Sequence, residues 1–118
     1  MNDPTAERSM EAELAAQGTT VVLETIGRRS HAPRRVTVGF VEDGEDLLVA
    51  ASSEATHWAR NLAREPSCFT ELRGVRTRRQ ALALSGSEAE AAVVALILKY
   101  GTPAERLGGG PAFRLVAV

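Results

Sequence analysis

The sequence predicts a mostly β protein of the α+β class, in which six antiparallel strands form a barrel with short flanking helices. Three observations support this fold. Several short runs alternate apolar and polar residues or are rich in β-branched residues, which is typical of strands. Short helical segments interrupt these runs. The 118 residues are 44% hydrophobic, which suits one domain over residues 1–118.

The first two elements differ in their periodicity. Residues 1–18 hold an N-terminal helix, predicted over residues 5–17 and ended by Gly18. Its apolar stripe contains little more than Met10 and Leu14, so we expect it to pack loosely. Residues 19–27 then form a strand of β-branched residues.

A β-hairpin is predicted over residues 34–52. Val36, Val38 and Phe40 alternate on one face, residues 42–45 make the turn, and residues 47–51 return. Residues 28–35, which join the first strand to this hairpin and include its first two residues, contain four arginines. Pro33 disfavours a helix in that stretch, so we expect an arginine-bearing loop.

The second half of the chain alternates helices and strands. Thr56 caps a helix that ends before Pro66, and two strands joined at Gly74 follow. Ser87 and Glu90 form a capping box for the clearest helix, which ends at Gly101. A short helix from residue 102 and a strand over residues 112–118 complete the prediction.

Composition excludes several classes of protein. A net charge of −1 and an aromatic content of 4% argue against a nucleic-acid-binding protein. Cys68 is the only cysteine, so no internal disulfide or cysteine-based zinc site can form. The sequence shows no secretory signal and no membrane-spanning run, so we expect a cytoplasmic protein without stable membrane insertion.

The arginines of the loop, Arg28, Arg29, Arg34 and Arg35, have no acidic residue among them. Arginine presents a planar fork of donors that fits phosphate and carboxylate oxygens, and the Ser30 hydroxyl would add to such an anion site. A solvated basic loop is the plain alternative. A nucleic-acid-binding patch is a third interpretation, which composition disfavours.

Other residues of interest are weaker signals. Trp58 and Asn61 lie one turn apart on a helix, and a lone Trp is usually a core residue. His31 and His57 lack the spacing of a metal site, so we predict no metal, and no motif indicates a catalytic acid, base or nucleophile. Tyr100 is expected to lie partly in the core and partly at a substrate pocket. A second basic run most simply forms a solvated face: Arg73, Arg76, Arg78 and Arg79.

Two motifs together resemble a known family. The segment VVLETIGRRSHAPRRVTVGFVEDGEDLLVAAS, followed by HWARNLAREP, resembles the deazaflavin-dependent nitroreductase family. That family belongs to the split β-barrel flavin-binding superfamily, with pyridoxamine-phosphate-oxidase-like proteins. The resemblance covers residues 21–73 well and the remainder in outline, and it implies a split barrel.

The resemblance also implies a cofactor and a reaction. Residues of the arginine loop fall where the family holds the phosphodiester and acidic tail of the deazaflavin coenzyme F-420, and residues further along line its ring pocket. The family transfers a hydride from the reduced coenzyme to a quinone, an enone or a nitro compound. The implied cofactor-binding residues are Arg28, Arg29, Ser30, Pro33, Arg34, Ser52, Trp58 and Asn61.

Four positions depart from the family pattern, the mildest of which is Arg29 in place of a lysine. His31 and Ala32 replace a glycine and its neighbour, and Ser53 replaces a lysine. These departures leave an alternative open: a member of the same superfamily that binds FMN, haem or another small ligand, or that binds no cofactor, and that is not a reductase. A small-molecule substrate is the expected partner, and a homodimer is compatible with the superfamily.

Overall fold

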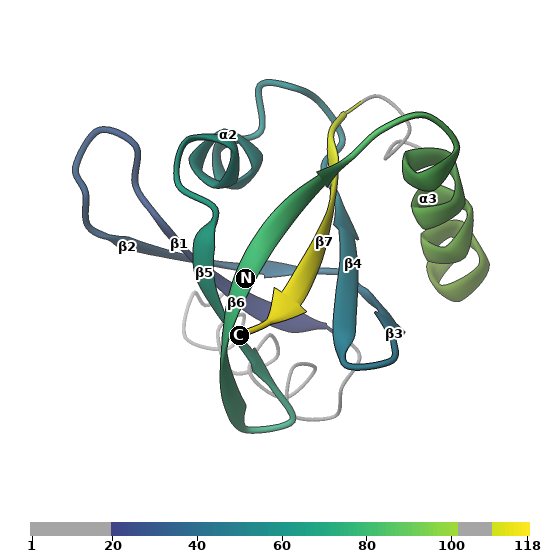
Figure 1. The fold of residues 1–118 in the computed structure, drawn as a ribbon, viewed down its shortest axis with the longest axis horizontal. Coiled ribbons are helices and arrows are strands. Elements are labelled where there is room, and N and C mark those ends of the chain that lie inside the picture. Colours follow the sequence, from purple (N-terminus) through teal and green to yellow (C-terminus); the bar gives the residue numbers. More distant parts are fainter. Residues whose placement is uncertain (1–19, 102–109) are drawn as a thin grey trace, which may run out of the picture.

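A computed structural model of the chain describes residues 20–101 and 110–118, which form seven strands and two helices (Figure 1). The helices predicted within residues 1–18 and from residue 102 lie outside the described residues. The elements, in chain order, are β1 (Val21–Ile26), β2 (Pro33–Val38), β3 (Val41–Asp43), β4 (Asp46–Ala50), α2 (His57–Arg64), β5 (Ser67–Leu72), β6 (Val75–Leu84), α3 (Gly86–Tyr100) and β7 (Ala112–Ala117).

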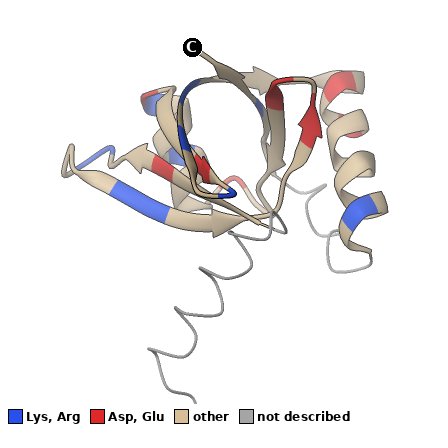
Figure 2. Cartoon of the chain, turned by 90° about the horizontal axis from the view of Figure 1, so that it is seen from below, with Lys and Arg blue, Asp and Glu red and all other residues tan. Residues whose placement is uncertain are grey.

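All seven strands belong to one antiparallel sheet in the order β2-β1-β5-β6-β7-β4-β3. The strands at its two ends, β2 and β3, are joined by Gly39 and Phe40 alone. The sheet therefore has to curl until its ends approach each other, and Figure 2 shows the resulting barrel-like ring of strands. The predicted mostly β, antiparallel class is confirmed.

The predicted number of six strands is wrong, because the segment taken as one hairpin contains three strands. β2 pairs with β1 rather than with the strand that follows it, and Val36 lies opposite Leu23. The short strand β3 then pairs with β4 around the turn at Gly44. Alternation through Val38 and Phe40 suggested one continuous strand, but the strand ends at Val38, and the chain changes its pairing partner from β1 to β4.

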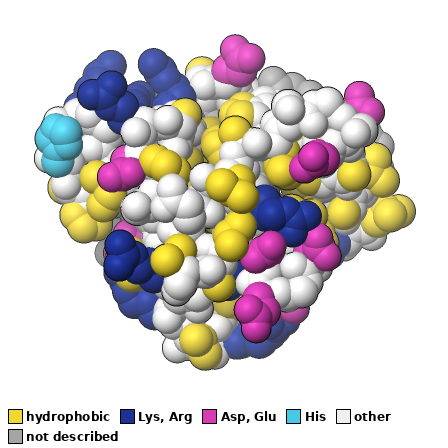
Figure 3. All heavy atoms as spheres, viewed as in Figure 1, with side chains coloured by type: hydrophobic (Ala, Val, Ile, Leu, Met, Phe, Trp, Pro, Cys, Tyr) yellow, Lys and Arg dark blue, Asp and Glu magenta, His cyan; other side chains and the backbone are white. Residues whose placement is uncertain are grey.

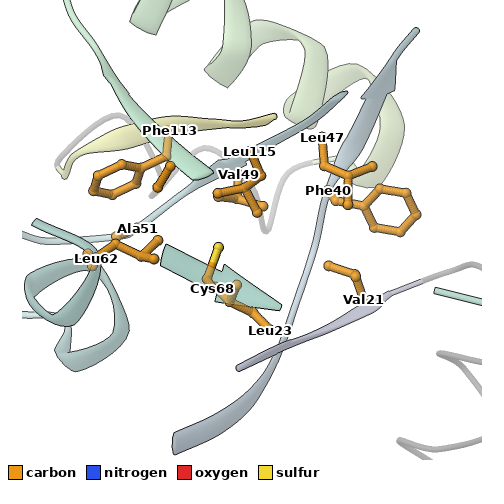
Figure 4. Close-up of a cluster of buried hydrophobic side chains, with 12 residues drawn as sticks. Val21, Leu23, Phe40, Leu47, Val49, Ala51, Leu62, Cys68, Phe113 and Leu115 are labelled. Atoms are coloured by element: carbon orange, nitrogen blue, oxygen red, sulfur yellow. The ribbon is translucent and has the colours of Figure 1, made fainter. Parts of the chain in front are cut away.

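The barrel interior is the main hydrophobic core (Figure 4). Its side chains come from both halves of the sheet, and α2 adds Ala59 and Leu62 from one end. Cys68 is among the buried residues, and desolvation raises the pKa of its thiol to about 11, so the thiol is neutral near pH 7. The remaining members of this core are Val21, Leu23, Phe40, Leu47, Val49, Ala51, Ala81, Phe113 and Leu115.

Strand β4 is buried on both faces, which explains its unbroken apolar run. Leu47 and Val49 face the barrel interior, whereas Leu48 and Ala50 face outward against α3. Leu96 of α3 is fully buried in this second cluster. The opposite side of α3 is also apolar but exposed, as the hydrophobic side chains at the right of Figure 3 show.

The last turn of α3 holds the junction between β2 and β3. The Tyr100 hydroxyl accepts a hydrogen bond from the Phe40 backbone N–H at 3.0 Å and lies 3.2 Å from the Phe40 carbonyl, to which it can donate. Lys99 Nζ donates to the same carbonyl at 2.7 Å. A Cβ on Gly39 would lie 3.1 Å from the Tyr100 ring, so glycine allows the ring to cover the chain there.

We expect Tyr100→Phe to lower the free energy of unfolding by about 1–2 kcal/mol, because the Phe40 amide would lose its acceptor while the ring stays packed. Urea denaturation of the variant and the wild type measures the difference. Leu98→Ala, at an exposed position of the same helix, is the control and should change the stability by no more than about 0.5 kcal/mol. Equal stabilities of Tyr100→Phe and the wild type would contradict the role of the hydroxyl.

Both helices begin near the predicted positions. Thr56 is the N-cap of α2, as predicted, although its side chain makes no capping hydrogen bond. The predicted capping box of α3 is wrong, because the helix begins two residues earlier and its N-cap is Ser85. Gly86 has a φ of 56°, in the left-handed region of the backbone that favours glycine. The chain can therefore turn directly from β6 into the helix.

Within residues 20–101 and 110–118, neither helix combines the length and the apolar character that a crossing of the bilayer requires.

Candidate anion-binding site

A cavity of about 410 Å³ lies between the β1–β2 turn and the start of α2. Its wall brings together six of the eight residues that the resemblance implied: Arg28, Arg29, Ser30, Arg34, Trp58 and Asn61. These two groups are distant in sequence and meet because α2 packs beside β1 (Figure 1). The cavity is completed by Thr25, Gly27, Arg35, Val36 and His57.

The turn between β1 and β2 is closed by two backbone hydrogen bonds. Gly27 N–H donates to the Ala32 carbonyl and His31 N–H donates to the Gly27 carbonyl, both at 2.8 Å. The Ser30 hydroxyl accepts from Ala32 N–H at 3.2 Å and lies 3.5 Å from Arg34 Nη2. A Cβ on Gly27 would lie 2.6 Å from Ser30 Oγ, so glycine keeps this turn compact.

His31 occupies the left-handed region of the backbone, with a φ of 59°. Glycine favours this conformation, and the family pattern places a glycine at this position. The turn thus keeps a glycine-like shape although the residue has changed. The loop with all four arginines was also predicted too long, since Arg34 and Arg35 lie in β2.

Because His31 is strained, we expect His31→Gly to raise the free energy of unfolding by about 0.5–1 kcal/mol. Left-handed backbone costs a non-glycine residue about 1–2 kcal/mol, and the greater chain entropy of glycine removes part of this gain. Chemical denaturation measures the change. His31→Val should have the opposite sign, because β-branched residues tolerate this region poorly. A destabilised glycine variant would contradict the proposed strain.

Three cations at this cavity lack acidic partners. Among the described residues, no carboxylate forms an ion pair with Arg28, Arg29 or Arg34. Desolvation lowers the pKa of the Arg28 guanidinium, and repulsion from Arg60 and Arg29 adds to the shift. In Figure 3, Lys and Arg side chains gather at the upper left, where Figure 1 places the turn and α2. This region therefore carries positive charge that no described carboxylate offsets.

Other arginines of the described sheet have partners. Arg35 pairs with Glu71 at 2.6 Å, and Arg76 pairs with Glu24 at 2.6 Å. The hydrogen bond from Arg76 is the main cause that lowers the pKa of Glu24.

The second basic run contains one exception to the predicted solvated face. Arg73 pairs with Glu42 at 2.6 Å, and Arg78 is exposed. Arg79 is instead buried and bonds to Thr70 Oγ1 and to two backbone carbonyls. Inward and outward residues alternate along β6, so one member of the run had to face the barrel interior.

Trp58 packs against the core and also lines the cavity. Its ring is half-buried, packs against the main core and lies 6.2 Å from the Phe113 ring, centroid to centroid. The same residue contributes to the cavity wall. The core interpretation and the pocket interpretation of this tryptophan are thus compatible.

Three predicted site residues lie away from this cavity wall. Pro33 is the first residue of β2, opposite Ile26, and is exposed. Ser52 is exposed in the connection between β4 and α2. Tyr100 lies at the junction of β2 and β3 and bonds to Phe40.

Sequence reasoning did not assign His57 or Thr25 to the site. His57 Nδ1 lies 3.2 Å from Arg28 Nη2, and Thr25 Oγ1 lies 3.2 Å from Asn61 Nδ2. The position of His57 beside Trp58 is a usable signal, although the sequence pattern raises histidine only as a metal ligand or as part of a catalytic site. The described residues contain no group of three or more potential metal ligands, counting His, Cys, Asp and Glu.

A family model matches a stretch of the chain that includes all of these residues. The model described as F420H(2)-dependent quinone reductase matches residues 5–103, which is most of the chain. The chain belongs to this family. The resemblance based on the arginine turn and the Trp58 helix is thereby confirmed, and the protein is an F-420-dependent reductase by family. No protein of curated function matches the chain significantly in sequence.

Solved structures share the split-barrel fold. An F420-H2 dependent reductase (FDR-A) is 22% identical, with a TM-score of 0.70, over 82% of this chain and 93% of that chain. A protein described as a domain-swapped dimer is 21% identical, with a TM-score of 0.69, over 96% of this chain and 99% of that chain. The heme storage protein HutZ of Vibrio cholerae is 18% identical, with a TM-score of 0.69, over 100% of this chain and 92% of that chain. At these identities the likeness shows the fold alone.

Proposed function

We propose that this reductase transfers a hydride from reduced coenzyme F-420 to a small electrophilic organic substrate, namely a quinone, an enone or a nitro compound. One observation carries the proposal: the cavity combines three cations that have no described acidic partner with the ring of Trp58. Phosphate and carboxylate groups would offset the cationic cluster, and an aromatic ring system would pack on the apolar wall.

The residues present fit the coenzyme at both of its ends. Its phosphodiester and acidic tail suit Arg28, Arg29 and Arg34, with the Ser30 hydroxyl as a further donor. Trp58 and Val36 offer apolar surface at the same cavity for the ring. A cavity of about 410 Å³ is within the size range of small-ligand sites.

The bound coenzyme would supply the hydride from its deazaflavin ring. The protein's own side chains bind the anionic part, orient the molecule and limit the access of water. We assign no catalytic acid or base among the cavity residues. Tyr100, predicted at a substrate pocket, bonds to the barrel junction, so the proposal does not depend on it.

Parallel titrations test the proposal. The purified protein is mixed with coenzyme F-420, with FMN and with hemin, and binding is followed by fluorescence or absorbance. Binding of F-420 in preference to FMN and hemin supports the proposal. A preference for FMN or hemin, or the absence of binding, would contradict it and favour the alternative of a non-reductase member. Steady-state assays with quinones, enones and nitro compounds then identify the substrate class.

Further properties remain predictions that separate measurements can check. Binding to nucleic acid is not expected, and a salt-titrated assay would reveal phosphate-driven association if it occurred. A homodimer is compatible with the fold, and analytical ultracentrifugation measures the oligomeric state. The cytoplasmic location predicted from the sequence can be checked by fractionation.

A further inference from the structure

Arg28 is held differently from the arginines on the sheet. Arg35 and Arg76 each contact a carboxylate, which cancels much of their charge. The guanidinium of Arg28 instead contacts two uncharged groups, one on Asn61 and one on His57. An arginine can be fixed by acceptors of either kind, but only neutral acceptors leave its charge intact for a ligand.

The contact with Asn61 has a defined orientation. Asn61 Oδ1 lies 2.9 Å from Arg28 Nη1 and 3.3 Å from the Arg28 backbone N–H. Both Arg28 groups can only donate, so the amide oxygen must face them and the amide nitrogen must face Thr25, 3.2 Å away. Asn61 is 4% exposed and Thr25 is fully buried, so this anchor is rigid.

The contact with His57 also has a defined direction. Arg28 Nη2 can only donate, so His57 Nδ1 must accept, and the imidazole must be the neutral form that carries its proton on Nε2. Two of the three guanidinium nitrogens of Arg28 are therefore engaged. The remaining N–H groups stay available to a ligand, because each Nη atom has a second hydrogen.

We propose that Asn61 and His57 are positioning residues that fix the Arg28 guanidinium through neutral acceptors, so that it meets the anionic group of the coenzyme pre-oriented and fully charged. This inference rests on the proposed function for the identity of the anion. A free arginine side chain loses rotamer freedom when it binds a ligand, and pre-orientation avoids part of that cost. A carboxylate at either position would orient Arg28 equally well but would compete with the ligand.

Three substitutions of His57 separate the explanations, and His57 is exposed, so the variants should fold. His57→Asn keeps a neutral acceptor and should bind F-420 within about twofold of the wild type. His57→Ala removes the acceptor and should weaken binding about fivefold, and His57→Asp should weaken it about tenfold or more because its charge pairs with Arg28. Equal losses for Asn and Ala, or wild-type binding by Asp, would overturn the proposal.

Asn61→Asp provides a second test, in which stability and binding should separate. The carboxylate can still accept from Arg28, and the Thr25 hydroxyl can rotate to donate. We expect thermal stability equal to or above that of the wild type, with F-420 binding weakened about tenfold or more. A merely structural Asn61 would not give this pattern, so unchanged binding in a stable variant would overturn the proposal.

A measurement on the ligand-free protein keeps this inference distinguishable from the proposed function. Nitrogen-15 NMR at about pH 8, above the ordinary titration range of histidine, reports which ring nitrogen of His57 is protonated. We expect the Nε2–H form almost exclusively, and a measurable fraction of the Nδ1–H form in Arg28→Ala, because a free imidazole populates both neutral tautomers. A His57 protonated on Nδ1 would overturn the inference. The expected tautomer without any binding of F-420 would support the Arg28 contact and refute the proposed function alone.

Discussion

Replacement of both Arg28 and Arg34 by alanine is expected to weaken F-420 binding about 100-fold or more, because each charge-assisted hydrogen bond contributes about 1.5–3 kcal/mol. The two residues lie at the same cavity without acidic partners among the described residues. Fluorescence titration measures the loss. The wild-type affinity should also fall as salt rises, and the variant should show a weaker dependence.

A double substitution of Arg73 and Arg78 by alanine is the matched control, since it removes the same charge from exposed positions in the β5–β6 turn and in β6, outside the cavity wall. Its F-420 affinity should stay within about twofold of the wild type at moderate salt. Equal losses in both variants would mean that general attraction, rather than a local site, binds the coenzyme. Unchanged affinity in Arg28→Ala/Arg34→Ala would contradict the anion site itself.

Arg79→Met is expected to lower the free energy of unfolding by about 2–4 kcal/mol. Arg79 is 7% exposed, and it donates to Thr70 Oγ1 at 2.7 Å, the Glu45 carbonyl at 2.8 Å and the Leu115 carbonyl at 3.1 Å. Methionine fills much of the same space but leaves these acceptors without their donor. Urea denaturation, monitored by circular dichroism, measures the effect.

Arg78→Met is the control for this change, because the adjacent residue on β6 is exposed on the opposite face. Its stability should remain within about 0.5 kcal/mol of the wild type. Arg79→Lys should recover part of the loss, since one ammonium group can reach some of the acceptors. Similar stabilities of Arg79→Met and Arg78→Met would show that the buried hydrogen bonds contribute little.

Much of the fold could be predicted from local patterns in the sequence. Alternation, glycine turns and helix boundaries located both described helices and most strands, because these signals act over a few residues. The pairing of β2 with β1 was missed, since pairing depends on contacts between whole strands. The break between β2 and β3 at Gly39 was missed for a related reason: the Tyr100 ring that covers Gly39 is distant in sequence.

The candidate site was predictable where residue type alone indicated its chemistry. Unpaired arginines indicated an anion, and six of the eight implied residues line the cavity. The roles of Asn61 and His57 could not be predicted, because they depend on which atoms face Arg28 across two elements. The burial of Arg79 could not be predicted from the sequence either, because the arginines within residues 73–79 suggest a solvated face.

The packing of α2 links the stability of the protein to the binding of its ligand. One side of this helix lies in the core through Ala59 and Leu62, and another side forms part of the cavity through Trp58 and Asn61. Unfolding therefore destroys the cavity, so a ligand must shift the melting equilibrium by mass action. At a concentration 100 times its dissociation constant, it would add about 2.7 kcal/mol. Melting temperature is thus a label-free screen of candidate cofactors, independent of any assumed substrate.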